Sequence, residues 1–326
     1  MTYEDMQMIL KKLGKTDIEI SAVVMGTWQA GRAMWADIDD TQTERAMQTA
    51  FDAGVTTFDT ATVYGDGHSE QILGKALRSV RTKAVIATKV FPHSLAYDKV
   101  FKACHKSLKD LGTDYIDLYQ IHWPAGSFGS KKIPIEESMS ALNKLREDGK
   151  IRAIGVSNFS REQIAEAAKY GQIESLQPPY SLFWRHAETD AMPYCTENSI
   201  SILAYSPMAQ GILTGKFGPD HQFAKGDHRA KNRLFLPENF ARVQEALAKL
   251  GPIADRNHIS LGQLALAWVI SHPNACAIAG ARNAEQAVQN AKAGSVSLCE
   301  EDLAEMDRIG RIVTDHLDTN PVLWKW

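Results

Sequence analysis

Short apolar segments that alternate with amphipathic, helix-like segments constrain the fold of this chain more than any other feature. The apolar segments have the length of strands, and between them apolar residues recur with helical spacing. Strands that alternate with helices pair in parallel through crossover connections. The predicted strands are residues 23–26, 56–60, 84–88, 115–122, 153–157, 176–177, 202–206 and 277–280. Eight such strands predict a (β/α)8 barrel, or TIM barrel, in which residues 1–326 form a single domain.

Additions to the regular pattern are predicted before, within and after the barrel. Residues 11–20 are typical of a short hairpin, and residues 300–312 have the spacing of an extra helix. Two long loops, residues 124–132 and 214–237, follow predicted strands. Long loops are usually functional or disordered, and these two should lie where the carboxyl ends of the strands meet.

Start and stop signals set the expected helix boundaries. Thr41 or Thr43 can cap a helix that runs to Ala53. A second helix is expected to start at Pro134 and to stop at Gly149. Two further helices are expected to open at Ser69–Glu70 and at the capping-box pair Ser160 and Gln163.

Composition excludes several classes of protein. The net charge is −3 with both signs interspersed, so no nucleic-acid or membrane partner is expected. The four cysteines lie far apart, and the ten histidines show no metal-ligand spacing, so we expect reduced thiols and no metal site. The first residues lack a signal-peptide pattern, and no apolar run reaches membrane-spanning length. These features predict a soluble, cytoplasmic protein.

Four polar side chains stand at or just after the ends of neighbouring predicted strands. Asp59 lies near the end of one strand, and Tyr64 follows five residues later. Lys89 and His122 close the next two strands. In one parallel barrel these four groups would converge, because the carboxyl ends of the strands share a face. Taken singly, each has a structural explanation, such as a buried ion pair or a turn aromatic; together they favour catalysis.

These residues lie in segments that resemble a known family. The segments FDTATVYG, ATK, DLYQIHWP, GVSNF and AYSPMAQGILTGK occur in this order. In them the chain resembles the aldo-keto reductases, most closely a bacterial stress-type branch, from Lys12 to about Arg311. The resemblance implies NADPH-dependent reduction of aldehydes or ketones to alcohols. It also implies that Asp59, Tyr64, Lys89 and His122 form the catalytic tetrad.

The chemistry of carbonyl reduction explains why these residue types would be needed. The carbonyl oxygen needs a proton as the hydride arrives, and a tyrosine with a pKa of about 10 is a poor donor. The Lys89 ammonium would lower the pKa of Tyr64, and Asp59 would hold that ammonium in place. A pKa near neutrality would take about 3 units, or roughly 4 kcal/mol. His122 would orient the carbonyl oxygen.

The resemblance also implies a site for NADP(H) across the carboxyl face of the barrel. No G-x-G-x-x-G follows a strand, so a doubly wound dinucleotide fold is not indicated. Ser157, Asn158 and Gln177 match the residues that hold the nicotinamide amide, and Tyr205 matches the aromatic that stacks on its ring. The other implied cofactor residues are Gly26, Thr27, Trp28, Asp59, Ser206, Pro207, Met208, Gly211, Lys216, Gly280, Arg282, Gln286 and Asn290.

The segment around Arg282 matches the site of the adenosine 2′-phosphate. Arg282 lies at a predicted helix N-terminus, where backbone dipoles also favour an anion. Gln286 and Asn290 are one turn apart on one helix face. Gln289 departs from the branch, which usually has a glutamate at this position.

Substrate contacts are expected from Trp28, Tyr64, His122 and Trp123, with further contributions from residues 34–35 and the aromatic tail at 321–326. The substrate would be a small carbonyl compound that the sequence does not name, and protein partners are not predicted. One alternative is an NADP(H)-sensing binding module with little turnover, because potassium-channel β-subunits resemble the same superfamily. Another is a metal-dependent barrel hydrolase, which the missing ligand spacing argues against.

Overall fold

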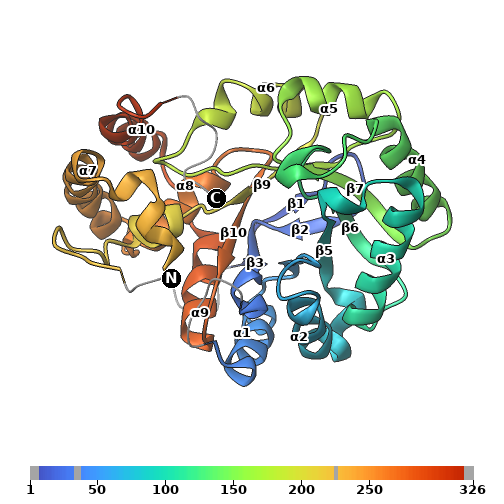
Figure 1. Ribbon diagram of the computed structural model, residues 1–326. Coiled ribbons are helices and arrows are strands. Elements are labelled where there is room, and N and C mark those ends of the chain that lie inside the picture. The colour runs from blue at the N-terminus through green and yellow to red at the C-terminus, as the bar shows by residue number, and fades with distance from the viewer. Residues whose placement is uncertain (1–6, 33–37, 224–226, 319–326) are drawn as a thin grey trace.

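The centre of the molecule is a closed barrel of parallel strands (Figure 1). The computed structural model describes residues 7–32, 38–223 and 227–318. Within them the barrel strands are β3 (Val23–Gly26), β4 (Thr57–Asp59), β5 (Val85–Val90), β6 (Ile116–Ile121), β7 (Ile151–Ser157), β8 (Ser175–Gln177), β9 (Ser201–Tyr205) and β10 (Ala275–Gly280). β10 pairs with both β9 and β3, which closes the ring. The predicted (β/α)8 barrel is confirmed.

Strand ends differ from the predicted ones by a few residues, and two differences matter for the site. β5 continues to Val90, so Lys89 is part of the strand rather than its end. β6 stops at Ile121, so His122 is the first residue after it. Parallel register places Asp59 beside Ala87, and Lys89 beside Gln120.

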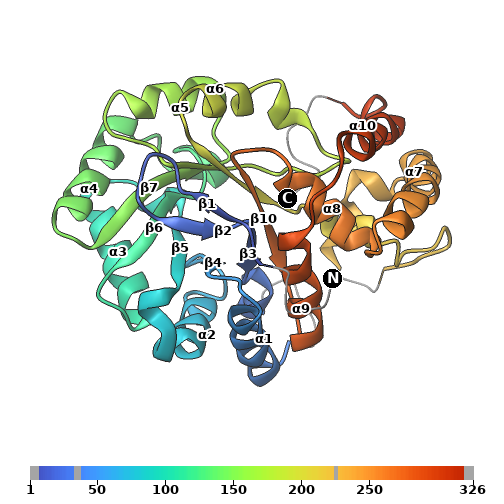
Figure 2. The ribbon, with the colours of Figure 1, turned by 180° about the vertical axis from the view of Figure 1, so that it is seen from behind.

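The predicted N-terminal hairpin is present and covers one end of the barrel (Figure 2). Its strands are β1 (Leu10–Lys12) and β2 (Glu19–Ser21). Leu13, Ile18 and Ile20 of the hairpin are buried in one cluster with apolar side chains of the barrel interior, such as Val24 and Leu118. This burial of apolar area stabilises the fold. The hairpin therefore closes the end of the barrel that lies opposite the carboxyl face.

Helices surround the barrel (Figure 1). They are α1 (Asp40–Asp52), α2 (His68–Leu77), α3 (Tyr97–Leu111), α4 (Ile135–Glu147), α5 (Arg161–Ala168), α6 (Ala191–Glu197), α7 (Pro237–Arg256), α8 (Leu261–Ile270), α9 (Ala284–Lys292) and α10 (Glu300–Thr314). The predicted extra helix is α10, which packs on α7. Arg256 of α7 donates to Asp302 at 2.7 Å and to Glu305 at 2.6 Å, both on α10.

Helix caps were predicted with mixed success. The Ser160–Gln163 capping box of α5 is confirmed. The predicted cap at Thr41 or Thr43 is wrong: Asp39 caps α1, and its carboxylate accepts from the Gln42 amide at 2.8 Å. A carboxylate is favoured there by the positive end of the helix dipole. The helix expected to open at Ser69–Glu70 is α2, which begins one residue earlier at His68 with Gly67 as its N-cap, and both Ser69 and Glu70 are buried in its first turn.

The two predicted long loops contain short 3₁₀ helices, at Ser127–Gly129, His228–Lys231 and Arg233–Phe235. Residues 34–35 and 321–326, which the sequence associates with the substrate, lie outside the described residues. In the described part of the chain, every helix is too short or too polar to cross a membrane.

Candidate active site

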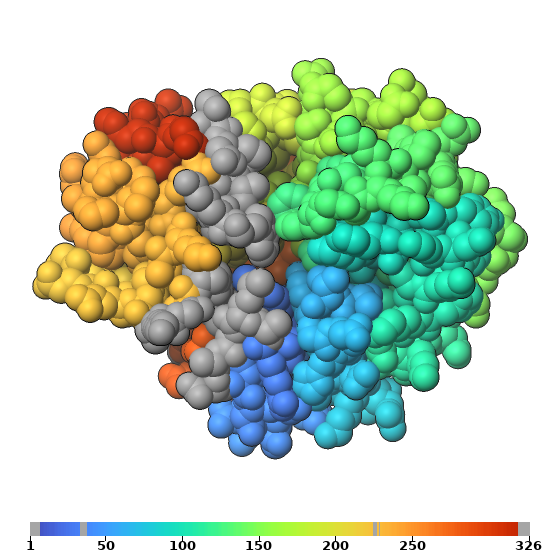
Figure 3. Space-filling view, in the orientation of Figure 1, coloured from blue at the N-terminus to red at the C-terminus, as the bar shows by residue number. Residues whose placement is uncertain are grey.

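A cavity of about 1070 Å³ opens at the carboxyl face of the barrel (Figure 3). Among the described residues, each individual residue predicted to contact the cofactor or the substrate lines it. Of the four predicted catalytic residues, Asp59, Tyr64 and His122 line the cavity, whereas Lys89 lies fully buried behind them. The site residues inferred from sequence are therefore brought together in one place.

Lys89 connects the acid and the phenol. Its Nζ donates to Asp59 Oδ1 at 2.6 Å, to the Thr60 carbonyl at 2.8 Å and to Tyr64 Oη at 3.4 Å. Burial alone would lower the pKa of Lys89, but the Asp59 carboxylate and Tyr64 outweigh it and raise the pKa above its usual value. Lys89 is therefore an ammonium ion at neutral pH.

Tyr64 differs from the expectation in one respect. Loss of solvation raises the pKa of the Tyr64 phenol, and the opposing effect of the Lys89 charge does not overcome it. The expected shift of this pKa towards neutrality is therefore absent in the protein alone. The phenol keeps its proton at neutral pH and can donate it, and Lys89 stands ready to stabilise the phenolate that results.

His122 is held neutral beside Tyr64. Burial, together with the nearby Lys89 charge, keeps the pKa of His122 well below its usual value. The two rings meet edge to face with centroids 5.9 Å apart. His122 Nδ1 is buried without a hydrogen-bond partner among the described residues. A neutral imidazole carries one N–H donor, which suits an orienting role towards a carbonyl oxygen.

Asp59 is tied to the residues expected to hold the nicotinamide amide. Its second oxygen accepts from Gln177 Nε2 at 2.9 Å. Ser157 donates to the Gln177 carbonyl at 2.8 Å, and Asn158 Nδ2 donates to Ser157 Oγ at 2.9 Å. Tyr205 donates to Asn158 Oδ1 at 2.8 Å. These polar groups form one network on the cavity wall, and Asn158 adopts an uncommon positive φ of 61° to join it.

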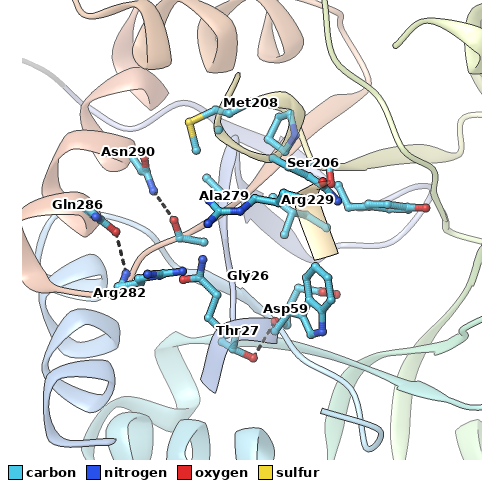
Figure 4. Close-up of a pocket in the computed structure, with 18 of the residues that line it drawn as sticks. Gly26, Thr27, Asp59, Ser206, Met208, Arg229, Ala279, Arg282, Gln286 and Asn290 are labelled. Carbon is cyan, nitrogen blue, oxygen red and sulfur yellow. Dashed lines mark hydrogen bonds between the residues drawn. The ribbon is translucent and has the colours of Figure 1, made fainter. Parts of the chain in front are cut away.

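At the other end of the cavity, Arg282 lies just before α9, and Gln286 and Asn290 lie on α9 (Figure 4). The Arg282 amide donates to Gln286 Oε1 at 2.9 Å, and Asn290 Nδ2 donates to the Gly280 carbonyl at 3.1 Å. Gln289, the residue that departs from the branch, accepts at Oε1 from Gln263 at 3.1 Å and also lines the cavity.

Three cations share this end of the cavity. Burial and the neighbouring positive charges of Arg229 and Arg282 lower the pKa of Lys216. Arg229 pairs with Asp227, but the cluster still places like charges close enough to repel one another. Such an arrangement is relieved by an anionic ligand, which the positive end of the α9 helix dipole also favours. These residues fit the phosphates of a dinucleotide.

Several cavity residues were missed by the sequence reasoning. They include Gln29, Phe91, Phe128, Gln210, Phe217, Phe223, Asp227, Arg229, Ser260 and Gln263. The loop at 214–237 was predicted to lie at this face, but no sequence motif in it indicated which of its residues would line the cavity. Phe91 follows β5, and its ring lies 5.8 Å from that of His122 and 5.4 Å from that of Phe128. Position after a strand was the signal that could have identified it.

Among the described residues, no group of histidine, cysteine, aspartate or glutamate side chains has a geometry that could hold a metal ion.

Comparison with known proteins identifies the family of this chain. The model of the aldo/keto reductase family matches residues 22–311. The chain is 37% identical over 287 residues to aldo-keto reductase YhdN of Bacillus subtilis, covering 84% of this chain and 85% of that protein. It is 33% identical over 316 residues to the NADH-specific methylglyoxal reductase of Escherichia coli, covering 90% and 96%.

Solved structures with the same fold also include members of this family. The glycerol dehydrogenase AKR11B4 of Gluconobacter oxydans superposes with a TM-score of 0.86 at 35% identity, covering 95% of this chain and 97% of that one. An aldo-keto reductase of Klebsiella pneumoniae, solved in complex with NADPH, gives a TM-score of 0.75 at 30% identity, covering 98% and 100%. The chain belongs to the aldo/keto reductase family of oxidoreductases.

Proposed function

We propose that this protein reduces aldehydes or ketones to alcohols with NADPH, and that Tyr64 gives the proton to the carbonyl oxygen. The observation that carries the proposal is the position of Lys89. A fully buried ammonium contacts both Asp59, at 2.6 Å, and the phenol of Tyr64, at 3.4 Å, at the cavity wall. A buried lysine needs a counter-ion, and Asp59 supplies it. The further contact with Tyr64 has a catalytic rather than a structural use.

Each of the four residues has a role that follows from its charge state. Tyr64 is protonated and is the proton donor. Lys89 is charged and stabilises the phenolate that remains after the transfer. Asp59 keeps Lys89 in place, and neutral His122 can orient the carbonyl oxygen by a hydrogen bond. When bound, the dinucleotide supplies the hydride.

The preference for NADPH rests on this chain's own cations, since the similar proteins differ: one is named as NADH-specific and another is in complex with NADPH. Arg282 lies at the start of α9, near Lys216. A cationic cluster at a helix N-terminus favours the extra phosphate that distinguishes NADPH from NADH.

The substrate would be a small or aromatic carbonyl compound. Trp28, Phe91, Trp123 and Phe128 line the cavity, and the Phe91 ring lies against those of His122 and Phe128. Aromatic walls bind planar or apolar groups by burial and ring contacts.

A substrate screen tests the proposal. The isolated protein is mixed with NADPH and with aldehydes, ketones, sugars and quinones, and consumption of NADPH is followed. Rapid multiple turnover with at least one carbonyl class is expected. Tight NADPH binding with only slow turnover across the panel would contradict the proposal and favour an NADP(H)-sensing binding module.

A further inference from the structure

A buried cluster of hydroxyl groups lies directly behind the candidate tetrad. Ser69, in the first turn of α2, is fully buried, and its Oγ lies 2.7 Å from Thr27 Oγ1 and 3.0 Å from Thr60 Oγ1. Thr27 Oγ1 in turn donates to the Asp59 carbonyl at 3.0 Å. We call Ser69, Thr27 and Thr60 the Ser69 cluster.

The Ser69 cluster joins segments that carry site residues. Thr27 precedes Trp28 in the loop after β3, and Thr60 follows Asp59 at the end of β4. The Thr60 carbonyl is also an acceptor for Lys89 Nζ. Ser69 Oγ also donates to the Thr27 carbonyl at 2.9 Å, and in its two contacts with the threonine hydroxyls either group can be the donor.

Ser69 also contacts the Tyr64 segment through its backbone. Its amide donates to the Tyr64 carbonyl at 3.2 Å. The chain between these residues is a run of turns, with positive φ at Gly65, Asp66 and Gly67. Such a segment has no ladder of its own to fix it, so its position depends on hydrogen bonds to its neighbours.

Glu70, the next residue of α2, contacts β5, the strand that carries Lys89. It is fully buried, and its Oε1 accepts from Thr88 Oγ1 at 2.7 Å. Thr88 precedes Lys89 in β5, and side chains alternate along a strand. The Glu70 contact therefore fixes the outer side of β5 at the point where Lys89 projects to the inner side.

We propose that Ser69 and Glu70 are positioning residues, which hold Tyr64 and Lys89 at the separation that proton transfer needs. The inference rests on the proposed function. The Lys89 Nζ–Tyr64 Oη distance of 3.4 Å is already at the outer limit of a hydrogen bond. A displacement of a few tenths of an ångström would break it, and misplacements of about 1 Å can cost about 100-fold in rate.

Ser69→Ala and a matched control separate positioning from simple stabilisation. Ser138 in α4 is also a buried helical serine, and it donates to the Leu95 carbonyl at 2.8 Å. Ser69→Ala should lower Tm more than Ser138→Ala, because Ser69 Oγ has three hydrogen-bond contacts and Ser138 Oγ donates one, so kcat is measured well below both Tm values. We expect kcat to fall about 10-fold in Ser69→Ala and less than about 2-fold in Ser138→Ala, with NADPH affinity nearly unchanged in both.

A conservative pair makes the same test at Glu70. Glu70→Gln keeps an oxygen that can accept from Thr88, whereas Glu70→Met keeps the length of the side chain and removes the acceptor. We expect Glu70→Gln to retain most of kcat and Glu70→Met to lose about 10-fold. Equal kcat in Ser69→Ala and Ser138→Ala, or in the two Glu70 variants, would overturn the proposal.

A crystal structure of Ser69→Ala gives a readout that needs no turnover. The Lys89 Nζ–Tyr64 Oη distance is expected to lengthen from 3.4 Å beyond hydrogen-bonding range. An unchanged distance would overturn the positioning role. If the native protein reduces no carbonyl compound, the proposed function fails, and this distance still decides whether Ser69 holds the two groups together.

Discussion

Arg282, in the cationic cluster, is the residue whose removal should change the choice of cofactor most. A charge-assisted hydrogen bond to a phosphate contributes roughly 1.5–3 kcal/mol. At about 1.4 kcal/mol per factor of ten, NADPH should bind about 10- to 100-fold more tightly than NADH. We expect Arg282→Ala to remove most of this difference, as measured by fluorescence titration with both dinucleotides. Equal affinity of the unmodified protein for the two would contradict the assignment.

Trp28 is expected to influence the choice of substrate. It follows β3 and lines the cavity with Trp123 and the ring pair Phe91 and Phe128. We expect Trp28→Ala to change the order of kcat/KM among aldehydes more than it changes the affinity for NADPH. A collapse of NADPH binding with an unchanged substrate order would mean that Trp28 serves the cofactor alone.

At the scale of the elements, the contributions of Asp39 and Thr41 to stability show which residue caps α1. Asp39 accepts from the Gln42 amide, whereas Thr41, one of the two caps expected from sequence, is exposed within the helix. We expect Asp39→Ala to lower the free energy of unfolding by about 1 kcal/mol, and Thr41→Ala to change it by less than about 0.5 kcal/mol. Urea unfolding measures both. The reverse order would restore the cap predicted from sequence.

The barrel was predictable because its strands are short apolar runs that a parallel sheet buries on both faces. The convergence of Asp59, Lys89 and His122 was predictable because each stands at or near the end of such a run. The helix caps were less predictable from sequence. Asp39 and Thr41 both lie near the start of α1, and only the backbone conformation shows that Asp39 is the N-cap. Arg229 was missed because the long loop brings it to the cavity by tertiary packing rather than by a local pattern.

The direction of the Tyr64 pKa shift could not be predicted from the sequence either. The charge of Lys89 could be inferred from its position, but the competing loss of solvation depends on the complete packing around the phenol. The direction of the shift is set by the balance of these two effects.

At the scale of the whole molecule, His122 makes stability depend on pH. Its folded-state pKa lies well below 6.5, so below that pH the unfolded chain binds a proton that the folded chain does not. Stability is therefore lost as pH falls through 6.5 towards the folded pKa, at up to about 1.4 kcal/mol per pH unit for this group. We expect His122→Asn to flatten the slope of unfolding free energy between about pH 5 and 6.5. An unchanged slope would show that His122 is not buried in its neutral form.

The most direct measurement is the rate of carbonyl reduction after the Tyr64 hydroxyl alone is removed. General acid catalysis typically contributes about 10²–10⁴-fold, so kcat of Tyr64→Phe should fall by that order while NADPH binding stays near normal. Lys89→Met should also be slow, and the double variant little slower than the slower single one, because the two groups act as a unit. If Tyr64→Phe keeps most of its activity, Tyr64 is not the proton donor.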